Sequence, residues 1–175
     1  ADVNSLPQKL METAAKWCPP KMEITESCSS SCVMGLLKLL SIPSQKEEGI
    51  SLSFDFQNPT LKNNPSLLSP LANCGNITSH EIRFCPDLRD CFSTLGLSPR
   101  SSVQHLKIFW SEVIGSERLF LPDNLKSFKV RKCGANATYL LLRETSKKSA
   151  LSGISIEHCV IYTDLENKLI NGLLK

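Results

Sequence analysis

Eight cysteines in a chain of 175 residues are the feature that most constrains its fold. They are spread along the chain rather than clustered, at Cys18, Cys28, Cys32, Cys74, Cys85, Cys91, Cys133 and Cys159. An even number of dispersed cysteines is typical of a disulfide framework in a secreted protein. The sequence therefore predicts that these cysteines form disulfides, in a pairing that their spacing leaves open. The alternative is a reduced protein in which several thiols are buried for structural reasons.

Two N-glycosylation sequons support an extracellular setting. Asn76 and Asn136 each stand two positions before a threonine, and neither sequon has proline in the middle. Asn58 and Asn64 begin similar triplets, but proline in the second position disqualifies both. No leader sequence is visible at the start, which suggests a mature or excised fragment. Together the cysteines and sequons predict a secreted glycoprotein.

Length and charge further narrow the classes of protein to which the chain can belong. A chain of this length suits a single domain over residues 1–175, and we expect a monomer. A net charge of +3, without a clustered basic motif, argues against nucleic-acid binding. The longest apolar stretch, Val33 to Ile42, contains Lys38 and is too short to cross a bilayer, so no membrane span is expected.

Alternating apolar and polar residues predict six or seven strands in the middle of the chain. The clearest covers Ile50 to Phe56, and the others are expected over 82–84, 103–110, 119–121, 126–132, 138–144 and 154–162. Helical spacing predicts helices over 6–17, 32–40 and 163–173, and one of Ser29, Ser30 or Ser31 is expected to cap the second. We recognise no internal repeat. Short strands joined by irregular connections indicate an antiparallel β-sandwich with short helices near both termini.

The sequence offers little support for catalysis. It contains neither the Gly-x-Ser-x-Gly elbow of serine hydrolases nor a His-Glu-x-x-His metal motif. Asp87 and Asp90 could form an acid pair, but a solvated loop is the default explanation for them. The cysteine spacings at 28–32 and 85–91 fit half-cystines better than zinc ligands. We therefore expect no enzyme activity, no cofactor and no metal.

Three stretches resemble a known viral domain. They are residues 6–20, 132–144 and 171–175, and they look like the SECRET domain, the C-terminal extension of orthopoxvirus soluble decoy tumour necrosis factor receptors. The resemblance covers essentially the whole chain. It implies a β-sandwich that binds a limited set of host chemokines, blocks their engagement with cellular receptors and so serves immune evasion. Since the closely spaced cysteine modules that bind tumour necrosis factor are lacking, this chain would not bind that cytokine.

The residues suggest where a chemokine would bind. Small or acidic side chains on the polar side of the first strand would let a basic partner approach closely, and two glutamates lead into that strand. Two charged residues on the next predicted strand point away from its apolar side. The predicted ligand-binding residues are Glu47, Glu48, Ser51, Ser53, Asp55, Glu81 and Arg83.

The positive net charge opposes long-range attraction of basic chemokines, so local complementarity would have to supply the affinity. The alternative function is a secreted or cell-surface β-sandwich that binds protein or glycan. Its contact with glycosaminoglycan would be the basic segment made of Lys126, Lys129, Arg131 and Lys132.

Overall fold

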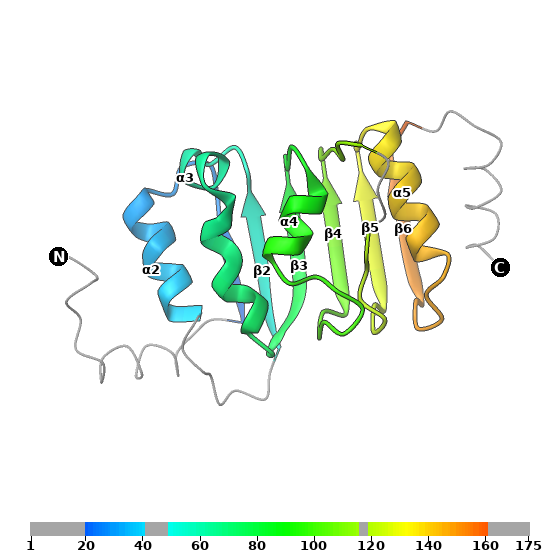
Figure 1. Ribbon diagram of the computed structural model, residues 1–175, viewed down its shortest axis with the longest axis horizontal. Helices are drawn as coiled ribbons and strands as arrows, with labels where there is room; N and C mark the ends of the chain where they lie inside the picture. The colour runs from blue at the N-terminus through cyan, green and yellow to red at the C-terminus, as the bar shows by residue number, and fades with distance from the viewer. Residues whose placement is uncertain (1–19, 41–48, 116–118, 161–175) are drawn as a thin grey trace.

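The computed structural model describes residues 20–40, 49–115 and 119–160. In this part of the chain a single sheet of six strands forms, and each strand pairs in parallel with the next one along the sequence (Figure 1). The strands are β1 (Lys21–Ile24), β2 (Ile50–Asp55), β3 (Ile77–Arg83), β4 (His105–Phe109), β5 (Ser127–Arg131) and β6 (Gly153–Glu157).

The helices lie in the connections between strands. They are α2 (Ser30–Leu40), α3 (Pro59–Asn63), the 3-10 helix η2 (Pro65–Asn73), α4 (Leu88–Thr94) and α5 (Ala135–Thr145). Parallel neighbours cannot be joined by a tight hairpin, so each connection must cross from one end of the sheet back to the other. Figure 1 shows all these helices on the same side of the sheet, where their apolar faces bury the inward side chains of the strands.

One residue pattern recurs in every strand. The first inward position holds residues that lie in register across the sheet: Met22, Leu52, His80, Leu106, Phe128 and Ile154. Successive members of this row are 30, 28, 26, 22 and 26 residues apart in the sequence. The next inward position carries Ile24, Phe54, Ile82, Ile108, Val130 and Ile156. These spacings show that one unit, a strand followed by a crossing connection, is repeated along the described residues at intervals of 22 to 30 residues. This part of the chain is therefore solenoid-like, and each repeat packs mainly on its two neighbours.

Each of the last four strands is followed directly by a residue with left-handed backbone geometry, although the residue type differs from strand to strand. The φ angles are 54° at Phe84, 49° at Trp110, 52° at Lys132 and 53° at His158. The ladder continues through this turn, since the amide of Phe84 donates to the carbonyl of Phe109 at 3.0 Å. The residue that follows each turn is buried or half-buried: Cys85, Ser111, Cys133 and Cys159.

The predicted antiparallel β-sandwich is wrong, because the structure is one parallel sheet with helices interspersed. Alternation reveals which side chains share a face, but it does not reveal the direction of the neighbouring strand. Residues 138–144, expected as a strand, lie inside α5, and the long connection before Ile77 holds α3 and η2. The expectation of no internal repeat is also wrong. The repeat is hard to recognise in the sequence because its period varies and its inward positions take several residue types.

Other local predictions are confirmed. The helix expected over 32–40 is α2, and the hydroxyl of Ser29 accepts a hydrogen bond from the amide of Cys32 at 3.3 Å, as a capping residue does. Strands over 50–56, 103–110 and 126–132 correspond to β2, β4 and β5. The helices expected over 6–17 and 163–173 fall outside the described residues. The four-residue strand β1 was not anticipated from the sequence.

Candidate protein-binding face

The outward side of the sheet presents three rows of side chains that run across the strands. Within the described residues no helix covers this side (Figure 1). The first row holds Lys21, Ser51, Ser79, His105, Ser127 and Gly153, and the second holds Glu23, Ser53, Glu81, Lys107, Lys129 and Ser155. The third row holds Asp55, Arg83, Phe109, Arg131 and Glu157. We call this surface the sheet face.

Arg83 organises charges on the β1–β3 half of the sheet face. Its Nη1 lies 2.9 Å from Oε1 of Glu23, although β2 runs between their strands. Its Nε also donates to Oε1 of Glu81 at 2.7 Å. The arginine reaches across β2 at Ser53, whose small side chain leaves room for it and is only 2% exposed. The ion pairs therefore hold the side chains of three strands in one arrangement.

This network revises the proposed ligand-binding residues. Ser51 and Asp55 lie half-buried on the sheet face of β2, and Glu81 and Arg83 lie beside them on β3. Both charged residues of β3 are engaged in ion pairs, and Ser53 is buried. Glu47 and Glu48 fall outside the described residues. Among the acids of the set, Asp55 forms no ion pair with another described residue, and its Oδ1 accepts from the amide of Gln57 at 2.8 Å.

The β4–β6 half of the sheet face is predominantly basic. Lys129 Nζ lies 2.6 Å from Oε1 of Glu157, and Arg131 Nε lies 3.7 Å from its Oε2. The hydrogen bond from Lys129 lowers the pKa of the Glu157 carboxyl below its ordinary value. Lys107, also on this half, is exposed and lies 3.7 Å from Glu81. One glutamate thus faces several cations, which leaves positive charge in excess here.

The basic segment expected to bind glycosaminoglycan is spread along β5 rather than gathered into a patch. Lys126 is exposed just before β5, and Lys132 is exposed just after it. Over that separation a strand extends roughly 20 Å. Lys129 and Arg131 lie between them on the sheet face and share Glu157.

An aromatic cluster stands where the strands end. Trp110, which is 36% exposed, stacks on Phe84 with ring centroids 4.9 Å apart and planes 5° from parallel. Phe109 contacts the same indole edge-on, with centroids 6.0 Å apart. The charged ends of Arg131 and Lys132 lie 5.9 and 5.6 Å from the indole centroid. These distances are in the range of cation–π attraction, so the cluster joins the aromatic rings to the basic half of the sheet face.

Sequence reasoning missed this cluster. Phe84, Trp110 and Lys132 occupy the same position in three successive repeats, directly before the residue that turns into the core. Recognising that period would have placed the three side chains next to one another. Without it, alternation alone places Phe84 beside Ile82 on the apolar side of its strand, and Trp110 beside Leu106 and Ile108 on the next.

Seven cysteines lie among the described residues, and all seven are free thiols, while Cys18 lies outside them. Four of these cysteines, an asparagine and a serine follow the six strands by two to four residues and are buried or half-buried: Cys28, Asn58, Cys85, Ser111, Cys133 and Cys159. The sulfurs of Cys85, Cys133 and Cys159 each lie 3.3 to 3.6 Å from a carbonyl oxygen two residues away. In the described part of the chain the expected disulfides are therefore absent. The seven cysteines there agree instead with the alternative of thiols that have a structural role.

The two sequons have different surroundings. Asn76 lies half-buried in the turn before β3, and Thr78 of its sequon is half-buried. Asn136 is exposed in the first turn of α5, but its Nδ2 donates to the carbonyls of Val113 and Gly115 at 3.0 and 2.7 Å. The nitrogen that would carry a glycan at Asn136 therefore already fastens the loop after β4.

No family model, no curated protein and no solved structure matches the chain. In the described residues no helix has the length and apolar character needed to span a bilayer. The same residues contain no group of three or more histidine, cysteine or acidic side chains placed to hold a metal ion.

Proposed function

We propose that the chain is a protein-recognition module that binds a protein ligand on the aromatic cluster and the adjoining basic half of its sheet face, with Trp110 as the anchor. The observation that carries this proposal is the exposed indole of Trp110, held in place by Phe84 and flanked by Arg131. Tryptophan and arginine are the residue types most enriched where binding energy is concentrated in protein interfaces. The rings are ordered before a ligand arrives, which reduces the entropy that binding must overcome.

The charge of the sheet face around Trp110 favours a ligand with an acidic segment. The charged ends of Arg131 and Lys132 lie beside the indole, and Lys107 and Lys129 stand in the neighbouring row of the sheet face. Glu157 lies within ion-pair distance of Lys129 and Arg131. An acidic ligand would compete with Glu157 for these cations. Its affinity would accordingly fall as salt screens the charges.

Chemokine binding stays a prediction that rests on the three stretches resembling the viral domain. The sheet face gives it limited support, because Glu23 and Glu81 are already neutralised by Arg83 and a basic chemokine would meet mainly Asp55. The expected secreted location and the role in immune evasion rest on the same ground, together with the cysteines and sequons. A chemokine panel is therefore measured beside acidic ligands.

The experiment is biolayer interferometry of the immobilised chain against purified chemokines and synthetic peptides that are acidic, neutral or basic and each contain one aromatic residue. We expect the acidic peptides to bind most tightly, with Trp110→Ala and Arg131→Glu each weakening binding at least about tenfold, a loss usual for an interface anchor. Met34→Ala serves as the control, because Met34 is exposed on α2, on the helical side.

Two results would contradict this assignment. If chemokines bind more tightly than the acidic peptides and Asp55→Lys abolishes the binding, the prediction from the viral resemblance is favoured instead. If binding to heparin exceeds all others and requires Lys126, the glycan-binding alternative is favoured. Binding that survives Trp110→Ala unchanged would remove Trp110 as the anchor.

A further inference from the structure

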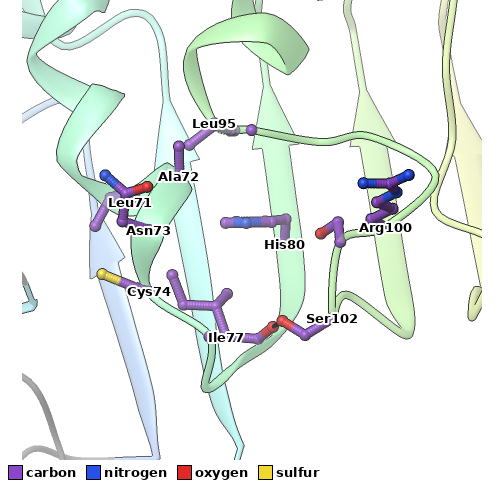
Figure 2. A pocket seen from close by; sticks show the side chains of 12 residues that line it. Leu71, Ala72, Asn73, Cys74, Ile77, His80, Leu95, Arg100 and Ser102 are labelled. Atoms are coloured by element: carbon purple, nitrogen blue, oxygen red, sulfur yellow. Dashed lines mark hydrogen bonds between the residues drawn. The ribbon is translucent and has the colours of Figure 1, made fainter.

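A cavity of about 190 Å³ opens on the helical side of the sheet, between η2, the start of β3 and the segment that follows α4. Figure 2 shows His80 in the middle of the labelled side chains, with Leu71 and Asn73 on one side and Arg100 and Ser102 on the other. Leu71 and Leu95 are buried apolar lining residues. The cavity is thus remote from the sheet face, which lies on the other side of β3.

His80 departs from the repeat at this cavity. It lies in register between Leu52 and Leu106, at an inward position that is apolar in the five other strands. The side chain is 1% exposed, and its Nδ1 has no hydrogen-bond partner among the described residues. A buried nitrogen without a partner is costly, and leucine would avoid that cost at the same position. Local violations of a fold's own pattern are expected where function, rather than stability, selects the residue.

The rest of the lining indicates what could satisfy His80. Arg100 is exposed, lines the cavity and forms no ion pair with another described residue. A guanidinium group binds a carboxylate through two parallel hydrogen bonds. A neutral imidazole nitrogen either donates or accepts, and a hydroxyl group can pair with it in both cases. The volume corresponds to about six water molecules at roughly 30 Å³ each, so the ligand must be small.

We propose that this cavity binds a small hydroxylated carboxylate, with its carboxylate held by Arg100 and its hydroxyl paired with Nδ1 of His80. The apolar walls contributed by Leu71 and Leu95 would contact the carbon chain between the two groups. The site is separate from the protein-recognition surface, so it can bind its ligand whether or not the sheet face binds a protein.

The test is an NMR titration of the full chain with lactate, propionate or inorganic phosphate, followed through the ring nitrogens of His80 and the amides of Gly96 and Ser101. We expect saturable shifts with lactate, and weaker binding of propionate because it lacks the hydroxyl group. Concentrations up to about 50 mM suffice, since a ligand of this size is expected to bind with a Kd on the order of 1 mM.

Two variants and a control identify the contacts. Arg100→Gln should weaken lactate binding at least about tenfold, the loss of one charge-assisted pair. His80→Leu, which restores the apolar residue of the repeat, should give lactate and propionate equal affinities, measured through the amide shifts of Gly96 and Ser101. Lys62→Gln, at an exposed residue of α3 that does not line the cavity, should change neither affinity. No saturable shift with lactate in the folded chain would overturn the proposal, and phosphate binding more tightly than lactate would overturn the carboxylate assignment.

Discussion

Phe84 and Trp110 stand 26 positions apart in the sequence, yet their rings stack with planes 5° from parallel and centroids 4.9 Å apart. Both residues have positive φ angles and both directly precede a buried turn residue. The stack is therefore a product of the repeat: two successive turns place the same position side by side, and each happens to carry an aromatic ring.

This stack should contribute measurably to stability. Offset aromatic pairs are worth about 0.5–1.5 kcal/mol beyond the area that they bury. A double-mutant cycle of Phe84→Leu and Trp110→Leu, followed by urea unfolding, should give a coupling energy of about 1 kcal/mol. Met34→Leu, at an exposed residue of α2, combined with Trp110→Leu is the control, and the effects of these two substitutions should add. A coupling near zero for the first pair would mean that the rings only lie close together.

Asn58 fastens two repeats to each other. Its Nδ2 donates to the carbonyls of Thr25 and Cys28 at 2.8 and 2.9 Å, and its Oδ1 accepts from the amide of Thr60 at 3.0 Å, at the start of α3. Asn58→Ala would remove these bonds from the part-buried carbonyls of Thr25 and Cys28 and from the amide of Thr60. We expect the free energy of unfolding to fall by about 2–4 kcal/mol, from several such bonds.

The matched control for Asn58 is Asn63→Ala, because Asn63 is exposed at the end of the same short helix. Its effect on urea unfolding should stay within about 0.5 kcal/mol, as for most surface substitutions. Equal effects of the two substitutions would show that the bonds of Asn58 contribute no more to stability than an exposed side chain does.

The polar side of β2 was predictable, and the architecture was not. Ile50, Leu52 and Phe54 alternate with small or charged residues, which alone determines that Ser51 and Asp55 share a face. The parallel pairing depends on connections that contain short helices interrupted by proline, such as the 3-10 helix around Pro70. Such segments look like loops to any test of periodicity, so the sequence favoured hairpins and a sandwich.

The cysteines misled the sequence interpretation for a related reason. A thiol that fills a buried turn and a half-cystine are the same residue type, and only the period of the repeat distinguishes them. Cys85, Cys133 and Cys159 each stand two residues after the end of their strand, and Ser111 takes the same place after β4. The candidate anchor Trp110 was hidden by the same missed period.

Cys133 and Cys159 should differ in reactivity. The thiol of Cys133 donates a hydrogen bond to the sulfur of Cys159, which lowers the pKa of Cys159 to about 6 and raises that of Cys133. Because the thiolate is the reactive form, iodoacetamide at pH 7 should modify Cys159 well before Cys133. Peptide mass spectrometry after timed quenching measures both rates.

Cys133→Ala tests whether this hydrogen bond, rather than solvent exposure, makes Cys159 the more reactive thiol. Removing the donor should raise the pKa of Cys159 and slow its alkylation at pH 7, whereas looser packing alone would speed it. The rate of Cys32, an exposed cysteine on α2, is the internal reference. Faster modification of Cys159 in the variant would contradict the proposed donor role of Cys133.

Asn136 should be a poor glycan acceptor. Its Nδ2 donates to the carbonyls of Val113 and Gly115, and Thr138 of the sequon is fully buried. When the chain is expressed through a secretory pathway, glycopeptide mapping should find a glycan at Asn76 and none at Asn136. Asn136→Ala should lower the free energy of unfolding by about 1–2 kcal/mol, because it removes these two bonds. Full glycan occupancy at Asn136 would show that its Nδ2 does not bind these carbonyls.

His80 makes the fold sensitive to acid. Burial lowers the pKa of its imidazole from 6.5 to about 4, so between these values the unfolded chain binds a proton that the folded chain does not. Its contribution is complete above pH 6.5 and is lost as the pH falls toward 4, by about 3 kcal/mol in all. Urea unfolding at pH 7 and pH 4 should show a smaller loss in His80→Leu than in the parent chain. At pH 7 the same variant should be more stable by about 1–3 kcal/mol, because no buried nitrogen is left without a partner. An unchanged pH dependence in His80→Leu would place the acid-sensitive group elsewhere.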